Sequence, residues 1–261
     1  MLEIMKVIAE FCDKYNITYE IGYGTALGAY RLKSFIPWDD DADLVMPRED
    51  YERFIRMFSR YGPSGYYIQS VDKDKRYYHP FIKVMKENTL FLEEKSVGVL
   101  DNNGIYVDIF PLDHVKKNSL PFRTNFYFLK FLKHAVCVKE TREFLKRRKK
   151  SIRYYLDFLS MIPVVFISNK RILRYINLRM RGKEEDLFFF DYNTIYGIDR
   201  DLMNKSVLFP PSTLTINGES FYAPHDIKTY LSTVYGKDYM VLPPVEKRRS
   251  HKPVSIKFES N

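Results

Sequence analysis

The chain has 261 residues, 45% of them hydrophobic, which suffices for one domain with an insertion or two small domains and excludes wholesale disorder. Its two cysteines, Cys12 and Cys137, lie far apart without Cys or His at ligand spacing. This argues against a disulfide scaffold and a zinc site and indicates a reducing compartment. The net charge of +9 is concentrated in residues 116–183, which contain 19 lysine and arginine residues but three acidic ones.

No targeting or membrane-spanning segment is expected. The first residues form an amphipathic helical pattern without the basic and apolar regions of a secretory signal. The longest clean apolar run, residues 161–167, contains a proline and is far shorter than the ~20 residues that a transmembrane helix needs. We therefore expect a cytoplasmic protein.

The first 115 residues alternate helical patterns with short strand patterns. Helices are expected at 2–15, 25–33 and 47–60, and strands at 18–21, 41–46, 66–71, 81–85, 91–93 and 104–113. In the last of these strands, Pro111 is expected to end the strand and Asp113 to be a turn residue.

A turn rich in small residues, Gly22-Tyr23-Gly24-Thr25-Ala26-Leu27-Gly28, follows the strand pattern at 18–21. Glycine lets backbone N–H groups approach a phosphate closely. The helix that starts at this turn would also point backbone donors and a partial positive charge at an anion. The turn therefore predicts a phosphate-binding loop.

Three aspartates, Asp39, Asp41 and Asp43, recur at every second position before an apolar run. In a strand, side chains at i and i+2 point to one face, so Asp41 and Asp43 would stand side by side. Two carboxylates this close repel each other, and burial would raise their pKa values unless a cation lies between them. Such oxygen ligands suit Mg²⁺ or Mn²⁺ rather than Zn²⁺. A solvated acidic loop is the alternative, but the glycine turn upstream favours metal-assisted phosphoryl or nucleotidyl chemistry.

A further carboxylate, Asp108, lies in the middle of the apolar strand pattern at 104–113, where an unpaired charge would be costly. A salt bridge, a hydrogen-bonded turn or a shared metal would each offset that cost. We favour the metal, because a third carboxylate from a neighbouring strand would complete the pair at Asp41 and Asp43. Lys83 likewise lies in an apolar strand pattern and needs a partner.

The second half of the chain begins with the basic segment 116–183, whose Phe, Tyr, Leu, Lys and Arg residues predict two or three helices. Further on, Asn217-Gly218 predicts a β-hairpin over 213–222. Residues 226–235 predict a helix that ends at Gly236.

Several segments at both ends of the chain form a recognisable set, whereas the basic centre matches least. They are Gly24–Arg31, Phe35–Asp43, Met46–Tyr51, Phe81–Val84, Asn88–Thr89, Tyr106–Asp113, Tyr230–Leu231, Tyr235–Gly236, Asp238–Met240, Leu242–Pro244 and His251. This set resembles the LicD family, bacterial phosphocholine transferases of cell-surface glycans with fukutin and fukutin-related protein as animal relatives. Ala26 and Tyr30 depart from the leucine and valine that many relatives carry and could shape the donor pocket.

The resemblance implies an α+β, nucleotidyltransferase-like fold, in which a short mixed sheet is flanked by helices. Residues 1–115 would form the catalytic core, 116–183 a basic helical insertion, and 184–261 the part that completes the same domain. The implied activity is transfer of a phospho-alcohol from a CDP-activated donor to a sugar hydroxyl of a glycan or its lipid-linked precursor. The donor is CDP-choline in the named bacterial members and CDP-ribitol or CDP-glycerol in some relatives. Lipopolysaccharide, teichoic acid and capsule are the candidate glycans.

The resemblance also implies roles for individual residues. Asp41, Asp43 and Asp108 would hold Mg²⁺ or Mn²⁺, and either Asp108 or the metal would activate the sugar hydroxyl. The turn Gly24-Thr25 would cradle phosphate. The remaining candidates surround this centre. Arg31 and Lys83 are candidate phosphate contacts, with an exposed helix residue as the alternative for Arg31. Asp39 and Asp40 either support the metal ligands or cap the loop. Trp38 either packs the loop, which we favour, or stacks on the base, and His251 either reaches the site from the tail or is structural.

The basic segment 116–183 has three interpretations. It could attract the protein to the inner face of an anionic membrane, as interleaved aromatic and basic residues do in interfacial helices. It could attract an anionic glycan acceptor, or it could be a solvated helical face. Two other function classes stay open: a nucleotidyltransferase acting on RNA or an antibiotic, and a non-catalytic glycan-binding module. No RNA-binding motif accompanies the basic residues, so no nucleic-acid partner is expected.

Overall fold

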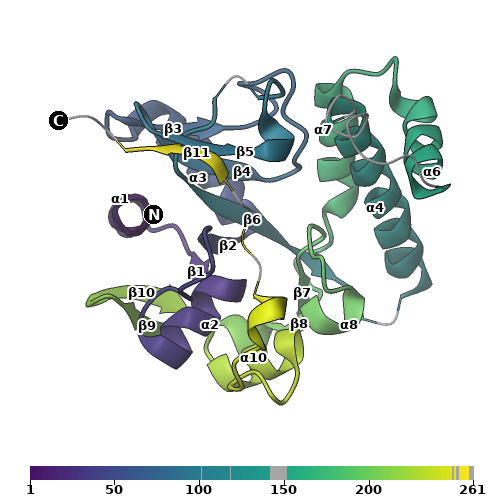
Figure 1. The fold of residues 1–261 in the computed structure, drawn as a ribbon. Helices are drawn as coiled ribbons and strands as arrows, with labels where there is room; N and C mark the ends of the chain where they lie inside the picture. Colours follow the sequence, from purple (N-terminus) through teal and green to yellow (C-terminus); the bar gives the residue numbers. More distant parts are fainter. Residues whose placement is uncertain (101, 118, 142–151, 249, 251–252, 259–261) are drawn as a thin grey trace.

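In the computed structural model, a mixed β-sheet flanked by helices forms the centre of the protein, which confirms the expected α+β fold (Figure 1). The structure describes the chain except residues 101, 118, 142–151, 249, 251–252 and 259–261, and the side chains of residues 95 and 153 are also not described. Among the described helices, none is long and apolar enough to cross a membrane.

The central sheet has the strand order β1–β2–β6–β4–β3, in which β2 and β6 are parallel and the other neighbours are antiparallel. The bounds are β1 (Glu20–Ile21), β2 (Asp43–Pro47), β6 (Tyr106–Val115), β4 (Ile82–Lys86) and β3 (Tyr66–Gln69). The later part of β6 also pairs with β7 (Phe188–Phe190), which pairs with β8 (Met203–Asn204). Two small antiparallel sheets join β5 (Leu90–Glu93) to β11 (Pro253–Lys257) and β9 (Ser212–Ile216) to β10 (Glu219–Ala223).

Helices cover the sheet and extend from it. The N-terminal helices are α1 (Leu2–Tyr15), α2 (Tyr23–Leu32) and α3 (Arg48–Tyr61). The basic segment forms α4 (Leu120–Glu140), α6 (Ile152–Met161) and α7 (Asn169–Met180), as expected, and these lie together to the right of the sheet in Figure 1. The remaining helices are α8 (Ile198–Asp201), α9 (Lys205–Leu208) and α10 (Ile227–Tyr235).

Local sequence explains several element boundaries. Ser119, Ser168 and Asp226 cap α4, α7 and α10, because each side chain accepts a hydrogen bond from a backbone N–H in the first turn. Gly236 ends α10 with a φ of 93°, a left-handed conformation that glycine adopts without strain. The hairpin predicted at Asn217-Gly218 is confirmed by the pairing of β9 with β10.

Two apolar clusters hold these elements together. In the main cluster, α1 and α3 pack on the sheet through rings such as Phe11, which lies 5.8 Å from Phe54 and 4.9 Å from Phe58 between centroids. The second cluster lies among α4, α7 and β7, with Leu129 and Leu173 fully buried in it. The basic segment therefore shares an apolar core with β7 and with residues of the first 115 such as Tyr78 and Val99.

The predictions for Pro111 and Asp113 are wrong. β6 continues to Val115, with Pro111 opposite Met46 of the parallel strand β2. On the other edge of β6, pairing with β4 ends at Ile109 and pairing with β7 begins at Asp113, so Pro111 lies where that edge has no described strand partner. A proline without an N–H is tolerated at such an interruption.

Asp113 is buried rather than a turn residue. Its carboxylate accepts two hydrogen bonds from the guanidinium of Arg48, at 2.8 Å from Nε and 2.6 Å from Nη2. Arg48 begins α3, and both side chains are almost inaccessible to solvent. This bidentate ion pair connects α3 to β6.

The strand containing the aspartates begins later than expected. β2 starts at Asp43, so Asp41 lies in irregular chain two residues before it. The turn at Gly22 also starts its helix earlier, at Tyr23 instead of Thr25. Elsewhere, the expected strands at 18–21 and 66–71 are shorter, as β1 and β3.

Candidate active site

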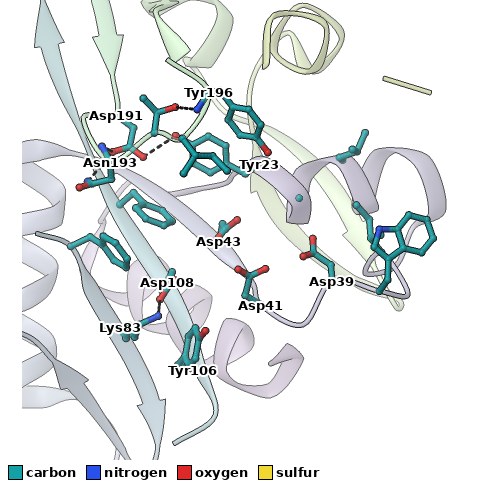
Figure 2. A pocket seen from close by; sticks show the side chains of 18 of the residues that line it. Tyr23, Asp39, Asp41, Asp43, Lys83, Tyr106, Asp108, Asp191, Asn193 and Tyr196 are labelled. Carbon is teal, nitrogen blue, oxygen red and sulfur yellow. Dashed lines mark hydrogen bonds and ion pairs between the residues drawn. The ribbon is translucent and has the colours of Figure 1, made fainter. Parts of the chain in front are cut away.

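Three neighbouring strands bring an acidic pair and a lysine into one row. Asp43 at the start of β2 lies opposite Asp108 in the parallel strand β6, and Asp108 lies opposite Lys83 in the antiparallel strand β4. Residues in register on adjacent strands direct their side chains to the same face. Asp41 and Asp39 approach the row from the chain before β2, as Figure 2 shows.

Lys83 and Asp108 form an ion pair, with 2.5 Å between Nζ and Oδ1. Both residues are buried, and the ammonium also lies 3.5 Å from the centroid of the Tyr106 ring. Hence each of the two charges that the sequence places in apolar strands has the other as a partner. Of the three explanations considered for Asp108, the structure contains the salt bridge; its role as a metal ligand stays a prediction.

The carboxyl group of Asp43 is in an unfavourable electrostatic environment. Burial raises its pKa well above the usual value, and the nearby charges of Asp41, Asp108 and Asp39 raise the pKa further, whereas Lys83 lowers it. A carboxylate surrounded by other carboxylates is stabilised by a bound cation. The donor chemistry of Asp41 and Asp43 therefore fits a hard divalent ion such as Mg²⁺.

The four aspartates do not, however, form a closed ligand set. Among the described residues, no group of three or more His, Cys, Asp or Glu side chains lies close enough together to hold a metal ion. Asp108 instead contacts the Lys83 ammonium. The residues present thus fit a cation at Asp41 and Asp43, and participation of Asp108 in the same site stays a prediction.

The glycine turn positions Asp43, the first residue of β2. The backbone N–H of Asp43 donates to Oγ1 of Thr25 at 2.8 Å, and the N–H of Gly22 donates to the carbonyl of Asp43 at 2.9 Å. Thr25 is buried and does not line the cavity, so its hydroxyl holds the strand. At Gly24, an added Cβ would overlap the carboxylate of Asp39, so a larger residue there would displace that side chain.

A cavity of about 840 Å³ lies over this row, within the range of roughly 300–1,000 Å³ that is typical of ligand pockets. Eight of the ten site residues predicted from the sequence line it. They are Gly24, Arg31, Trp38, Asp39, Asp41, Asp43, Lys83 and Asp108. Thr25 lies behind the wall, and His251 lies outside the described residues.

Arg31 and Trp38 connect the cavity to the C-terminal part of the chain. A terminal nitrogen of the Arg31 guanidinium donates to the backbone carbonyl of Tyr239, while its Nε is buried without a hydrogen-bond partner. The guanidinium of Arg248 lies 4.3 Å from the centroid of the Trp38 ring, which also packs against the main apolar cluster. Phosphate binding by Arg31 and base stacking by Trp38 stay predictions.

The sequence analysis did not find the second part of the cavity wall, which is aromatic with a buried acid. Tyr23 donates a hydrogen bond to Oδ2 of Asp191 at 2.8 Å, and Asp191 also accepts from the backbone N–H of Asn193 at 2.7 Å. Burial raises the pKa of Asp191. The Tyr23 ring lies 5.9 Å from Phe110 and 6.3 Å from Tyr196, and all of these residues line the cavity (Figure 2). An aspartate directly after three phenylalanines was the signal that could have revealed this wall.

Comparisons with known proteins relate the chain to one family. The family model "LicD/FKTN/FKRP, nucleotidyltransferase domain" matches residues 16–151, which is just over half of the chain. The chain is 26% identical over 255 residues to the lipopolysaccharide cholinephosphotransferase LicD of Haemophilus influenzae, and the alignment covers 96% of this chain and 92% of that protein. Shorter matches, 38% identical over 69 residues and 35% over 68, each cover 26% of the chain and relate it to uncharacterized proteins of Rickettsia typhi and Rickettsia prowazekii. The matched region covers 22% and 26% of those proteins.

The family match includes the glycine turn, the aspartates at 39–43, Lys83 and Asp108, which are the residues that the fold brings together at the cavity. The resemblance found in the sequence motifs is thereby confirmed. The chain belongs to the LicD/FKTN/FKRP family of nucleotidyltransferase-domain proteins.

Proposed function

We propose that this protein transfers phosphocholine from CDP-choline to a sugar hydroxyl of lipopolysaccharide or a related bacterial surface glycan. The relative that aligns over nearly the whole chain carries the name of a lipopolysaccharide cholinephosphotransferase. The observation that carries the proposal is the cavity itself, which combines an acidic row with an aromatic wall. The acidic row suits a cation, which could in turn bind a pyrophosphate, and the aromatic wall suits a quaternary ammonium group.

The acidic row would serve the phosphate end of the donor. Mg²⁺ bound at Asp41 and Asp43 would neutralise charge on the pyrophosphate and on the departing CMP. Lys83, already 2.5 Å from Asp108, would add a positive charge beside the reacting phosphorus. The buried Thr25 would keep Asp43 in place through its hydrogen bond to the backbone.

The transfer requires one bond to form and one to break at the phosphorus that carries choline. The sugar oxygen would attack this phosphorus, and the bond to the oxygen of CMP would break, so that CMP leaves with the bonding electron pair. The hydroxyl proton would pass to a carboxylate oxygen of Asp108, which also accepts a hydrogen bond from the Lys83 ammonium. These roles are part of the proposal.

The aromatic wall supports choline as the alcohol. Tyr23, Phe110 and Tyr196 offer aromatic rings, and Asp191 fixes the Tyr23 hydroxyl by accepting its hydrogen bond. Ring faces attract a quaternary ammonium through cation–π contacts worth about 0.5–2 kcal/mol each. Ribitol and glycerol carry no positive charge that could interact with these rings. The test therefore compares CDP-choline with the alternative donors CDP-ribitol and CDP-glycerol.

The test is CMP release, followed by phosphorus NMR, from CDP-choline, CDP-ribitol and CDP-glycerol with extracted glycan as acceptor. We expect release from CDP-choline only, and its loss in Asp41→Asn. Asp40→Asn is the matched control, because Asp40 neighbours Asp41 in the chain but does not line the cavity. Release from a CDP-alditol alone would replace choline as the alcohol. Turnover of UTP or ATP would instead favour a nucleotidyltransferase.

A further inference from the structure

One face of α6 and of the short turn after it carries large apolar side chains in solvent. They recur three or four residues apart, a spacing that places residues of a helix on one side. We name this set the α6 stripe. It consists of Ile152, Tyr155, Leu156, Leu159, Ile162 and Phe166, with exposed fractions from 54% at Tyr155 to 98% at Phe166.

The α6 stripe is not needed to hold α6 on the protein. The opposite face of the helix already supplies apolar contacts, because Met161 packs against the second apolar cluster and α6 lies against α4. On that face the rings of Tyr154 and Phe158 also contact each other within the helix, with centroids 4.7 Å apart. Single exposed apolar residues are ordinary, but six of them along one helix and the turn that follows it are typical of an interaction surface. α6 is therefore apolar on two sides, and only one of them is covered within the described part of the chain.

The charge around the α6 stripe indicates what could cover it. The segment 116–183, which contains α6, carries 19 lysine and arginine residues and three acidic ones. Exposed basic side chains include Lys130 on α4, which packs against α6, and Lys170, Arg171 and Arg174 on α7, which packs against α4 in turn. Of these, Lys170 and Arg174 pair with Asp72. Two copies of so basic a segment would repel each other, which disfavours self-association through this face.

An anionic partner would match the charge, and an apolar one would match the α6 stripe. A soluble acidic glycan or a nucleic acid backbone offers negative charge without an apolar surface, whereas an anionic lipid surface offers both. Helices with a large apolar face and basic surroundings lie in the headgroup region with their apolar side chains at the acyl boundary. None of the described helices could span the bilayer, which leaves contact at the surface.

We propose that the α6 stripe inserts into the interface of an anionic membrane, while exposed basic residues in the described part of the segment 116–183 lie at the lipid phosphates. Aliphatic and aromatic side chains of this size gain free energy when they leave water for the acyl boundary. Salt weakens the charge contribution but not the apolar one. Binding should therefore need anionic lipid, and high salt should reduce it without abolishing it.

The experiment measures partitioning of the full-length protein onto vesicles by flotation. We expect at least about tenfold stronger binding to phosphatidylglycerol–phosphatidylcholine vesicles than to pure phosphatidylcholine. The double variant Leu159→Ser/Phe166→Ser should lose at least about tenfold of this binding, since two large apolar side chains no longer enter the lipid. Phe258→Ser is the matched control, because Phe258 is also a largely exposed phenylalanine, at 75%, outside the basic segment, and should bind as the parent does.

A second variant reports insertion directly. Phe166→Trp keeps an aromatic ring at the most exposed position, and its fluorescence should be quenched by lipids brominated near the headgroup, beyond any change of Trp38 in the parent protein. Equal binding to both vesicle types, unchanged binding of the double variant, or an unquenched Phe166→Trp would each overturn the proposal. Sedimentation showing a dimer that the double variant dissociates would assign the α6 stripe to a second copy.

Discussion

The buried ion pair between Lys83 and Asp108 gives a quantitative test of the candidate site. The two side chains expose 8% and 9% of their surface, so removing one charge leaves the other poorly hydrated. Breaking a buried pair in this way costs about 3–5 kcal/mol. Lys83 also lowers the pKa of Asp43, so its loss increases repulsion at that carboxylate. We predict that Lys83→Met lowers the free energy of unfolding by about 3–5 kcal/mol at pH 7.5 without divalent cations.

The assay is urea unfolding followed by circular dichroism, with Lys86→Met as the matched control. Lys86 lies on the same strand, β4, but its ion pair with Glu3 is solvated, with 23% and 60% of the two side chains exposed. Its removal should change the free energy of unfolding by no more than about 1 kcal/mol. The double variant Lys83→Met/Asp108→Leu should recover most of the loss, because no buried charge is left without a partner.

Divalent cations make the test specific for the acidic row. If Mg²⁺ binds at Asp41 and Asp43, it should restore more stability to Lys83→Met than to the parent, because the ion replaces the missing positive charge. A loss in Lys83→Met as small as in Lys86→Met would refute the account of the ion pair. An equal Mg²⁺ effect on both proteins would refute the link between lysine and metal.

Three further predictions follow from individual contacts. Tyr23→Leu should weaken CDP-choline binding roughly 2- to 30-fold and leave CDP binding unchanged, because it removes an aromatic ring from the proposed ammonium site. Calorimetry with both nucleotides checks this. Equal weakening of CDP-choline and CDP binding would contradict it. Arg48→Met should lower the free energy of unfolding by about 3–5 kcal/mol, and Arg48→Met/Asp113→Leu should recover most of it; a double variant as unstable as the single one would show that the pair is not the cause. Burial raises the pKa of Asp201 to about 7, above the unfolded value of 3.8, so this carboxyl reduces stability most above pH 7 and not at all below pH 3.8. Asp201→Asn should therefore raise the melting temperature at pH 8 and raise it less at pH 5, and a gain that is independent of pH would contradict this assignment.

Elements with local signals could be predicted from the sequence. The apolar spacing of α1, the Asn-Gly turn between β9 and β10, and the glycine after α10 each act within a few residues, and the structure confirms them. Pro111 and Asp113 were misjudged because their environment depends on distant chain. Asp113 is stabilised by Arg48, 65 residues away, and the edge of β6 at Pro111 lies between two separate strands.

The residues of the candidate site likewise include some with a local sequence signal and some whose role depends on distant parts of the chain. Asp43, Asp108 and Lys83 carried a signal because a charge in an apolar strand requires a partner, although the sequence did not say which partner each would find. The Tyr23–Asp191 contact joins residues 168 positions apart, and although Asp191 follows three phenylalanines, neither segment indicates the other as its partner. Only the packing of β7 against β6 brings that aspartate to the cavity.

The most direct test of the central claim is calorimetric binding of CDP-choline, with and without Mg²⁺, to the parent protein, Asp41→Asn and Asp40→Asn. Binding does not depend on knowing the acceptor glycan, which makes it more direct than turnover. The account predicts Mg²⁺-dependent binding of CDP-choline that Asp41→Asn abolishes and Asp40→Asn retains. Binding that ignores Mg²⁺ and survives Asp41→Asn would contradict the role given to the acidic row, and absence of binding in the parent protein would contradict the donor.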